Sequence, residues 1–175
     1  MKKGIVISLA ILMMFLFVGC GEKDSIAQQL MGTSWYQTLT TETDLGAGYI
    51  TDEKDGERYN CDEITLTITS TATYSFEANT FNTTTEVKQI KSGITKIYDV
   101  EWVEGCTITT QKDKEVTEST TETESVNGTW NIENDRLYMI ENGATTGVSY
   151  SVSIVNNELI LENEYAGIFL RLKRK

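Results

Sequence analysis

Apolar and polar residues alternate with a period of two along most of this chain beyond Gly32. Ile64, Leu66 and Ile68 alternate with threonines, which places apolar side chains on one face of an extended segment and hydroxyls on the other. The abundant threonine also favours strands, because β-branched residues suit a pleated surface. The alternation recurs in residues 72–76, taken as the next strand, and in residues 98–102, 148–154, 159–161 and 168–172. The pattern predicts an all-β fold.

Short turns separate the predicted strands. The chain contains no proline, so its turns depend on Gly, Asn and Asp, which tolerate a positive φ. Three such pairs lie between alternating segments, at residues 134–135, 142–143 and 156–157. We expect one antiparallel meander of about eight to ten strands, either a closed barrel or a β-sandwich. A barrel is favoured, because closure removes the strand edges that a chain without proline cannot guard.

Three segments depart from the alternation. Asp24 is placed to cap a short N-terminal helix that runs to Met31 and stops at Gly32. Residues 43–60 mix glycines with charges and predict a long loop. Residues 112–125 are almost entirely Thr, Glu, Ser and Lys. That composition predicts exposure, either as two solvated edge strands or as a mobile excursion.

The N-terminus has the pattern of an export signal. Lys2 and Lys3 precede an apolar run of 14 residues, from Ile5 to Val18, and the small Gly19 follows. At about 1.5 Å per residue this run spans roughly 21 Å, too short for a transmembrane helix across a hydrocarbon core of ~30 Å. A secretory signal peptide is therefore the favoured interpretation.

Residues 17–20, with the sequence Phe-Val-Gly-Cys, resemble the signal of bacterial lipoproteins. The resemblance implies that the chain is cut before Cys20 and that lipid is attached to this cysteine. Residues 1–19 would be the signal peptide, residues 20–24 a lipidated tether, and residues 25–175 one domain. We therefore expect a lipid-anchored protein of the cell envelope, at the outer membrane or the cell surface and outside the cytoplasm. Its contact with the membrane would be the lipid on Cys20.

Composition argues against several functions. The net charge of −11 becomes −13 without residues 1–19, which contain two lysines and no acid; nucleic acid is therefore not expected as a partner. The absence of histidine excludes a Ser-His-Asp triad and histidine zinc sites. Asp52 to Glu57 form the densest acidic cluster, but Lys54 stands where a calcium loop needs an oxygen ligand. We expect no catalysis, no metal and no cofactor.

Two cysteines remain beyond Cys20, namely Cys61 and Cys106. An even number of cysteines in an exported protein favours a disulfide between them. Such a bridge would close a loop of about 45 residues and stabilise the fold by at most roughly 4 kcal/mol. Two free buried thiols are the alternative.

Two Gly/Trp sequences point to a family. In residues 30–35 a glycine and a tryptophan open the first strand after a short helix, and residues 128–130, Gly-Thr-Trp, match the pattern Gly-x-Trp strictly. The domain thus resembles the lipocalin-like domains of small bacterial lipoproteins. The resemblance implies a lipocalin-like barrel with one end closed by Trp35 or Trp130, and with Arg171 on the last strand packed over the ring. The alternative is that both tryptophans are core residues and Arg171 faces water.

Three functions follow from these observations. The first is the binding of a small, largely apolar ligand inside the barrel, with Tyr74, Phe76, Trp130 and Tyr150 in the lining. The second is a surface or envelope interaction protein, whose barrel is filled by its own side chains and which meets a protein or glycan partner. The third and least favoured is a hydrolase that uses two carboxylates. We favour a non-enzymatic binding or interaction role and expect a monomer.

Overall fold

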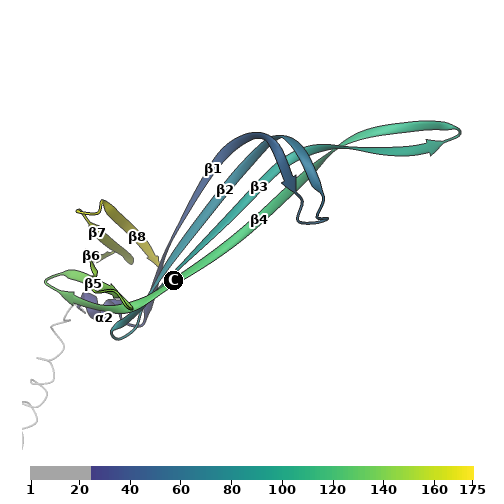
Figure 1. Cartoon of the computed structure of the whole chain (residues 1–175). Coiled ribbons are helices and arrows are strands. Elements are labelled where there is room, and N and C mark those ends of the chain that lie inside the picture. Colours follow the sequence, from purple (N-terminus) through teal and green to yellow (C-terminus); the bar gives the residue numbers. More distant parts are fainter. Residues whose placement is uncertain (1–24) are drawn as a thin grey trace, which may run out of the picture.

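The computed structural model describes residues 25–175, so the predicted signal peptide, Cys20 and the tether lie outside the described residues. One short helix and eight strands follow one another along this part of the chain (Figure 1). They are α2 (Ile26–Leu30), β1 (Thr33–Thr51), β2 (Arg58–Phe76), β3 (Thr80–Val103), β4 (Cys106–Glu133), β5 (Arg136–Glu141), β6 (Val148–Val155), β7 (Glu158–Asn163) and β8 (Ile168–Arg174). The predicted all-β fold with a short N-terminal helix is confirmed.

Each strand pairs with its neighbours in the sequence in antiparallel order, and β1 also pairs with β8, which closes the meander into a ring. The closure is short, since it consists of the pairs Trp35–Arg174 and Tyr36–Lys173. The predicted antiparallel meander that closes on itself is confirmed, and the eight strands fall within the expected number.

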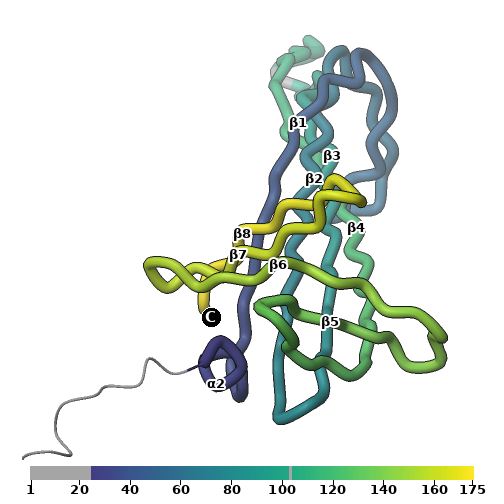
Figure 2. Tube along the Cα trace, turned by 90° about the vertical axis from the view of Figure 1, so that its left-hand side faces the viewer, coloured from purple at the N-terminus to yellow at the C-terminus, as the bar shows by residue number. Residues whose placement is uncertain are grey.

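The strands are very unequal in length, so the ring is not a regular barrel. β1 to β4 have 19 to 28 residues, whereas β5 to β8 have 6 to 8. The short strands complete a ring only at the end of the sheet near α2, and β1 to β4 continue far beyond it (Figures 1 and 2). We call the ring with α2 the base, and residues 37–73 and 84–127 the arm. The 28 residues of β4 span about 90 Å at ~3.3 Å per residue.

An apolar core fills the base. Every strand of the ring contributes to it, and α2 adds Leu30, which is fully buried. The buried residues are Leu30, Trp35, Phe76, Phe81, Trp130, Leu137, Met139, Val152, Leu159, Leu161 and Leu172. Ser25 begins the helix, because its hydroxyl accepts a hydrogen bond from the backbone N–H of Gln28, whose side chain accepts one from the backbone N–H of Ser25. The predicted cap, Asp24, lies outside the described residues.

The predicted turns lie where the sequence places them. Asn134 and Asp135 have φ values of 50° and 59°, and Asn156 and Asn157 have values of 52° and 63°. A positive φ at both central residues lets a two-residue hairpin follow the right-handed twist of its strands, and Asn and Asp adopt it readily. Gly143 also has a positive φ, of 85°.

Two predictions about strand boundaries are wrong. Residues 43–51 belong to β1 and residues 58–60 to β2, so the loop predicted at 43–60 is limited to 52–57. Gly46 and Gly48 lie at register shifts in the β1–β2 ladder; such a bulge bends a strand without ending it. Residues 64–69 and 72–76, taken as two strands, form one.

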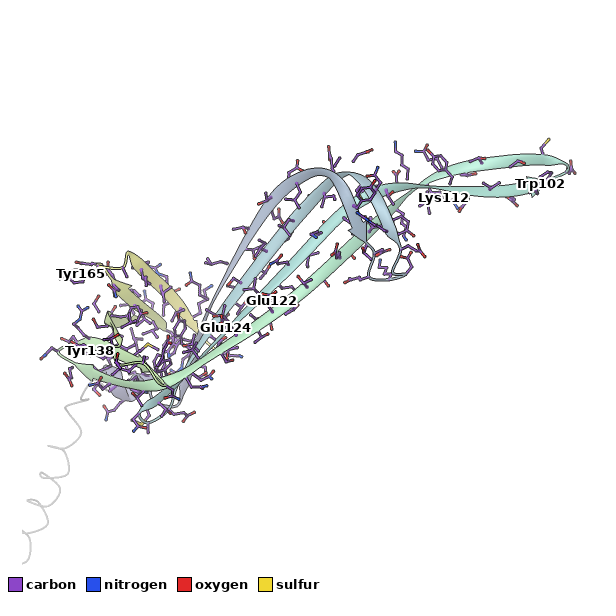
Figure 3. The ribbon with its side chains drawn as sticks, in the orientation of Figure 1. Trp102, Lys112, Glu122, Glu124, Tyr138 and Tyr165 are labelled. Atoms are coloured by element: carbon purple, nitrogen blue, oxygen red, sulfur yellow. The ribbon has the colours of Figure 1, made fainter. Side chains whose placement is uncertain are left out.

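Residues 112–125 form the middle of β4 and pair residue by residue with β3. Most of their side chains are exposed, as the composition predicts, and Glu122 and Glu124 are examples (Figure 3). The edge-strand alternative therefore holds, although the segment is part of one strand instead of two. Extended pairing with β3 satisfies the backbone on one side, which a mobile excursion would not achieve.

A second, smaller core lies in the arm, where the β1–β2 hairpin bends over onto β4. Its four buried residues are Ile50, Cys61, Ile64 and Val116. Tyr59 packs beside them. The bend places the backbone N–H of Glu53 2.9 Å from the carbonyl oxygen of Thr117. We call this cluster the distal core.

The structure contradicts the predicted disulfide. Cys61 is buried in the distal core, close to Gly93 of β3, whereas Cys106 is exposed at the start of β4, opposite Val103. Residues 93 and 103 are ten residues apart on an extended strand, about 33 Å at ~3.3 Å per residue. A disulfide needs Cα atoms within ~7 Å of each other. Both thiols are therefore free.

Candidate functional site

Both tryptophans of the Gly/Trp sequences are core residues of the base. Trp35 is fully buried, and its ring N–H donates to Oγ1 of Thr33 at 2.8 Å. Trp130 is buried as well, and its ring N–H donates to the carbonyl oxygen of Glu77 at 3.0 Å. Because each indole N–H has an acceptor, neither ring carries an unsatisfied polar group into the core.

The prediction that Arg171 packs over a tryptophan ring is wrong. Arg171 points outward from β8, and its Nε lies 3.6 Å from Oε2 of Glu158. Arg174 instead places its guanidinium carbon 5.8 Å from the centre of the Trp35 ring, to which it is also paired in the β1–β8 ladder. Residues an odd number of positions apart point to opposite faces of a strand. Arg171 and Arg174 are three positions apart, so only Arg174 points to the side of β8 on which the Trp35 ring lies.

A hollow of about 340 Å³ opens at the rim of the base. Tyr74 and Tyr150, two of the four residues predicted to line a ligand cavity, do line it. The other two, Phe76 and Trp130, instead pack edge to face in the core, with ring centres 5.5 Å apart. The interior is therefore largely occupied by side chains, and the hollow is a surface feature with an apolar floor.

The two tyrosines of the hollow keep their protons. Burial raises the pKa of Tyr74, and the neighbouring Tyr150 raises it further. Burial also raises the pKa of Tyr150, with a smaller contribution from Glu141. Both hydroxyls are neutral at physiological pH and can donate a hydrogen bond to a ligand.

A charged cluster fastens the bent β1–β2 hairpin to β4. Nζ of Lys114 lies 3.0 Å from Oδ2 of Asp52, 2.5 Å from Oδ2 of Asp55 and 3.9 Å from the centre of the Tyr59 ring. Oγ of Ser119 donates a hydrogen bond to the carboxylate of Glu53, in the same loop, at 2.7 Å. We call residues 52–57 with Tyr59 and Lys114 the clasp. Asp52 is fully buried, which a carboxylate tolerates only when it is paired.

Three side chains of the clasp, Asp52, Asp55 and Lys114, are charged at neutral pH. The hydrogen bond from Lys114 lowers the pKa of Asp55 to about 2 and also lowers the pKa of Asp52. Asp55 and then Tyr59 are the main groups that raise the pKa of Lys114. The acidic loop, residues 52–57, was considered above as a calcium site. In the structure its carboxylates Asp52 and Asp55 pair with the ammonium group of Lys114 instead. Within residues 25–175, no group of three or more acidic or cysteine side chains is arranged to hold a metal ion.

Beyond the distal core only β3 and β4 continue, as a two-stranded hairpin. The β2–β3 ladder reaches the pair Ile64–Gly93, whereas the β3–β4 ladder extends to Val103–Cys106. In the described part of the chain, residues 94–115 therefore have no third strand on either edge. We call them the distal ribbon. They project furthest from the base, with Trp102 near the end (Figure 3).

The two faces of the distal ribbon differ in chemistry. Residues paired across a ladder share a face, and alternate residues project to opposite faces. In the outer part of the ribbon, residues 97–112, one face carries no charge and consists of Tyr98, Val100, Trp102, Thr107, Thr109 and Gln111. We call it the uncharged face. Nearer the distal core the same side of the ribbon carries the charged residues Lys96, Asp113 and Glu115. The other face, the charged face, carries Ile97, Asp99, Glu101, Ile108, Thr110 and Lys112.

The uncharged face exposes large apolar side chains. The exposed fractions are 62% for Tyr98, 61% for Val100 and 75% for Trp102. The alternation at residues 98–102 predicts a half-buried strand; the strand is present, but no second layer covers it. Sequence reasoning missed this surface because alternation identifies the two faces of a strand without locating the core. A signal of this exposure was present in residues 107–111, Thr-Ile-Thr-Thr-Gln, which lie across the ladder from residues 98–102. This segment has a single apolar residue, so it lacks the apolar face that a covered strand needs.

Comparison of the chain with protein families, with curated proteins and with solved structures finds no match. Among residues 25–175, no helix has the length and apolar character needed to cross a membrane. The lipoprotein signal and the lipocalin-like resemblance therefore stay predictions.

Proposed function

We propose that this protein is a lipid-anchored, non-enzymatic protein of the cell envelope that meets a macromolecular partner through the distal ribbon. The observation that carries the proposal is the exposure of Tyr98, Val100 and Trp102 at the end of a long arm. These side chains contribute to neither core. Exposed apolar surface that the fold does not need is typical of interaction sites.

The arrangement of the molecule supports this role. Residue 25 lies at the base, and the distal ribbon lies at the opposite end (Figures 1 and 2). Lipid on Cys20 would hold the base near the membrane through a tether of a few residues. The arm, which contains residues 106–127 of β4, would be free to reach up to about 70 Å from the base at ~3.3 Å per residue. The net charge of −13 that remains without residues 1–19 would also keep the protein body away from anionic headgroups.

The filled base supports an interaction protein over a carrier of small ligands. The eleven buried side chains of the base come from α2 and from every strand of the ring. The bulkiest, Trp35 and Trp130, take the space that a ligand would need. Small barrels are commonly filled in this way. The base then serves as a rigid mount for the arm.

A shortened variant tests the proposal. Replacing residues 97–112 with Asn-Gly keeps the pair Lys96–Asp113 and leaves Lys114 in the clasp, and Asn-Gly favours a two-residue hairpin turn. Chemical cross-linking in intact cells should join the wild-type protein to a partner and leave the shortened variant unjoined, with unchanged thermal unfolding of the base. Equal cross-linking of both proteins would contradict the proposal.

The anchor has its own test. Mass spectrometry of the mature protein should find Cys20 as the first residue, with lipid attached, as the resemblance of residues 17–20 implies. A mature protein that retains Met1, or an unmodified thiol at Cys20, would contradict anchoring.

A second candidate function is the binding of a small, largely apolar ligand in the hollow of the base. It is favoured by the neutral hydroxyls of Tyr74 and Tyr150 beside an apolar wall that includes Val126 and Met139. Native mass spectrometry of delipidated protein from its own host should then detect a bound small molecule, and Val126→Trp, which fills the hollow, should abolish it. A clean apo mass would contradict this candidate.

A further inference from the structure

Two aromatic anchors dominate the uncharged face. Trp102 and Tyr98 are 75% and 62% exposed, and they lie four residues apart on one strand, about 13 Å at ~3.3 Å per residue. Tryptophan and tyrosine are the residue types that most often supply the binding energy of protein interfaces. Their neighbours across the ladder, Thr107 and Gln111, add groups that can form hydrogen bonds at the edge of an apolar contact.

The size of the distal ribbon argues against a second copy of this chain as the partner. Two strands about 33 Å long and roughly 10 Å across present roughly 330 Å² per face. A stable interface needs about 800 Å² on each side, so two ribbons packed face to face would bury too little. A partner with a groove would contact one face, both edges and the turn, and would therefore bury more of the same ribbon.

The charges around Trp102 argue against a membrane. Asp99, Glu101 and Glu104 lie within a few residues of it, and Lys112 is engaged by Asp99. Anionic headgroups would be repelled by this net negative end. A protein surface with basic residues around an apolar groove is complementary to it, and such complementarity speeds association and selects the partner.

The backbone offers a second mode of contact. The β3 edge beyond Gly93 and the β4 edge before Val116 pair with no other strand among the described residues. Open edges can accept a strand from a partner, and side-chain pockets then provide specificity. An isolated two-stranded ribbon is also marginally stable in water, so a partner that pairs with an edge would order it further.

We infer that the distal ribbon docks its uncharged face into an apolar groove with a basic rim on a second, different protein of the envelope. The inference rests on the proposed function and specifies the class of partner. Trp102 and Tyr98 fill the groove, and the acidic residues at the end of the ribbon face the basic rim.

A photo-cross-linking amino acid placed on either face tests the inference in intact cells that carry the protein. Substituting it at Val100 places the probe on the uncharged face, and substituting it at Ile108, which is 48% exposed, places it on the charged face. We expect the probe at position 100 to give an adduct with one protein of a different sequence, identified by mass spectrometry. The probe at position 108 should give little of that adduct.

Matched variants test whether the cross-linked adduct depends on the aromatic anchor Trp102. In the position-100 background, Trp102→Thr keeps strand propensity and should abolish the adduct. With the identified protein purified, Trp102→Thr should weaken binding about thirtyfold, as expected for a hot-spot residue. Tyr165→Ala is the control, because Tyr165 is fully exposed but lies on the base (Figure 3). Its affinity should equal that of the wild type.

The acidic end is tested separately. Glu101→Gln combined with Glu104→Gln should slow association with the purified partner several-fold at low salt and reduce its dependence on ionic strength. An association rate that neither these changes nor added salt alters would overturn the basic rim.

The outcomes separate this inference from the proposed function. An adduct that contains a second copy of this chain, a glycan or a lipid would overturn the inference and leave an interaction through the ribbon intact. Equal adducts from positions 100 and 108 would overturn the assignment of the docking face. Failure of the proposed function would appear instead as unchanged cross-linking after residues 97–112 are replaced.

Discussion

The ammonium group of Lys114 lies 3.0 Å from the buried carboxylate of Asp52, which joins β4 to the loop that follows β1. The pair belongs to the clasp, in which the same ammonium group contacts Asp55 and the ring of Tyr59. The clasp holds the bent hairpin over the distal core, from which the distal ribbon emerges.

We predict that the clasp makes stability depend on acid. The folded-state pKa of Asp55, about 2, lies below its usual value of about 3.9. Ionised Asp55 therefore stabilises the folded state above pH ~4, and this stabilisation is lost as the pH falls towards the folded-state pKa. Asp55→Asn should be less stable than the wild type in urea unfolding at pH 7, and the difference should shrink steadily as the pH falls from about 4 to about 2. Asp62→Asn, an exposed control on β2, should show a much smaller difference, and a pH-independent gap for Asp55→Asn would contradict the prediction.

Gly128, the glycine of the Gly-Thr-Trp sequence, is predicted to tolerate no side chain. A Cβ atom there would lie 2.1 Å from the carbonyl oxygen of Ile140 and 2.5 Å from the Phe81 ring. Overpacking of this kind costs about 1–3 kcal/mol and occasionally more, and contact with the backbone places Gly128→Ala at the upper end. Urea unfolding measures the change in the free energy of unfolding. Ser125→Ala, exposed on the same strand, should stay within about 0.5 kcal/mol of the wild type.

The two free cysteines should react at very different rates. Cys106 is exposed, whereas Cys61 is buried in the distal core, where desolvation raises the pKa of its thiol. Since the thiolate is the reactive form, a maleimide should label Cys106 in the native protein and Cys61 only after unfolding. Mass spectrometry of residues 25–175 counts the labels. Two protected thiols that become reactive only with a reductant would instead indicate the disulfide that the structure contradicts.

Arg174 should matter more than Arg171 for the stability of the base. Its guanidinium group lies over the fully buried Trp35, whereas Arg171 makes an exposed ion pair. Cation–π contacts at exposed sites contribute about 0.5–1 kcal/mol, and Arg174 also takes part in the short β1–β8 closure. Arg174→Ala should therefore lower the free energy of unfolding by at least that amount. A larger loss for Arg171→Ala would contradict the assignment.

Local sequence signals predicted the strands and turns that the structure contains. The alternation of Ile64 to Ile68 and the pair Asn156-Asn157 act over two to six residues, and their physical causes, the pleat and the tolerance of positive φ, are equally local. The glycines at 46 and 48 misled the same reasoning, because a bulge and a loop have the same composition. Pairing with β2 decides between them.

The candidate site could be predicted only in part. Tyr74 and Tyr150 line one hollow, as expected, but Phe76 and Trp130 belong to the core. The apolar residues of 98–102 were expected to be half-buried, but 61–75% of their surface is exposed. Alternation states that a strand has an apolar face, whereas burial depends on whether another layer covers that face.

By itself, the sequence of this protein determined that it is a meander of antiparallel strands with tight turns, because side-chain alternation and turn chemistry need no distant partner. Only the tertiary structure decided that four strands outrun the ring, that Cys61 and Cys106 lie far apart, and that Arg174 meets Trp35. Each of these depends on the register and relative length of paired strands. Register is set by contacts between residues distant in sequence, and a shift of a single position moves a side chain from the core to water.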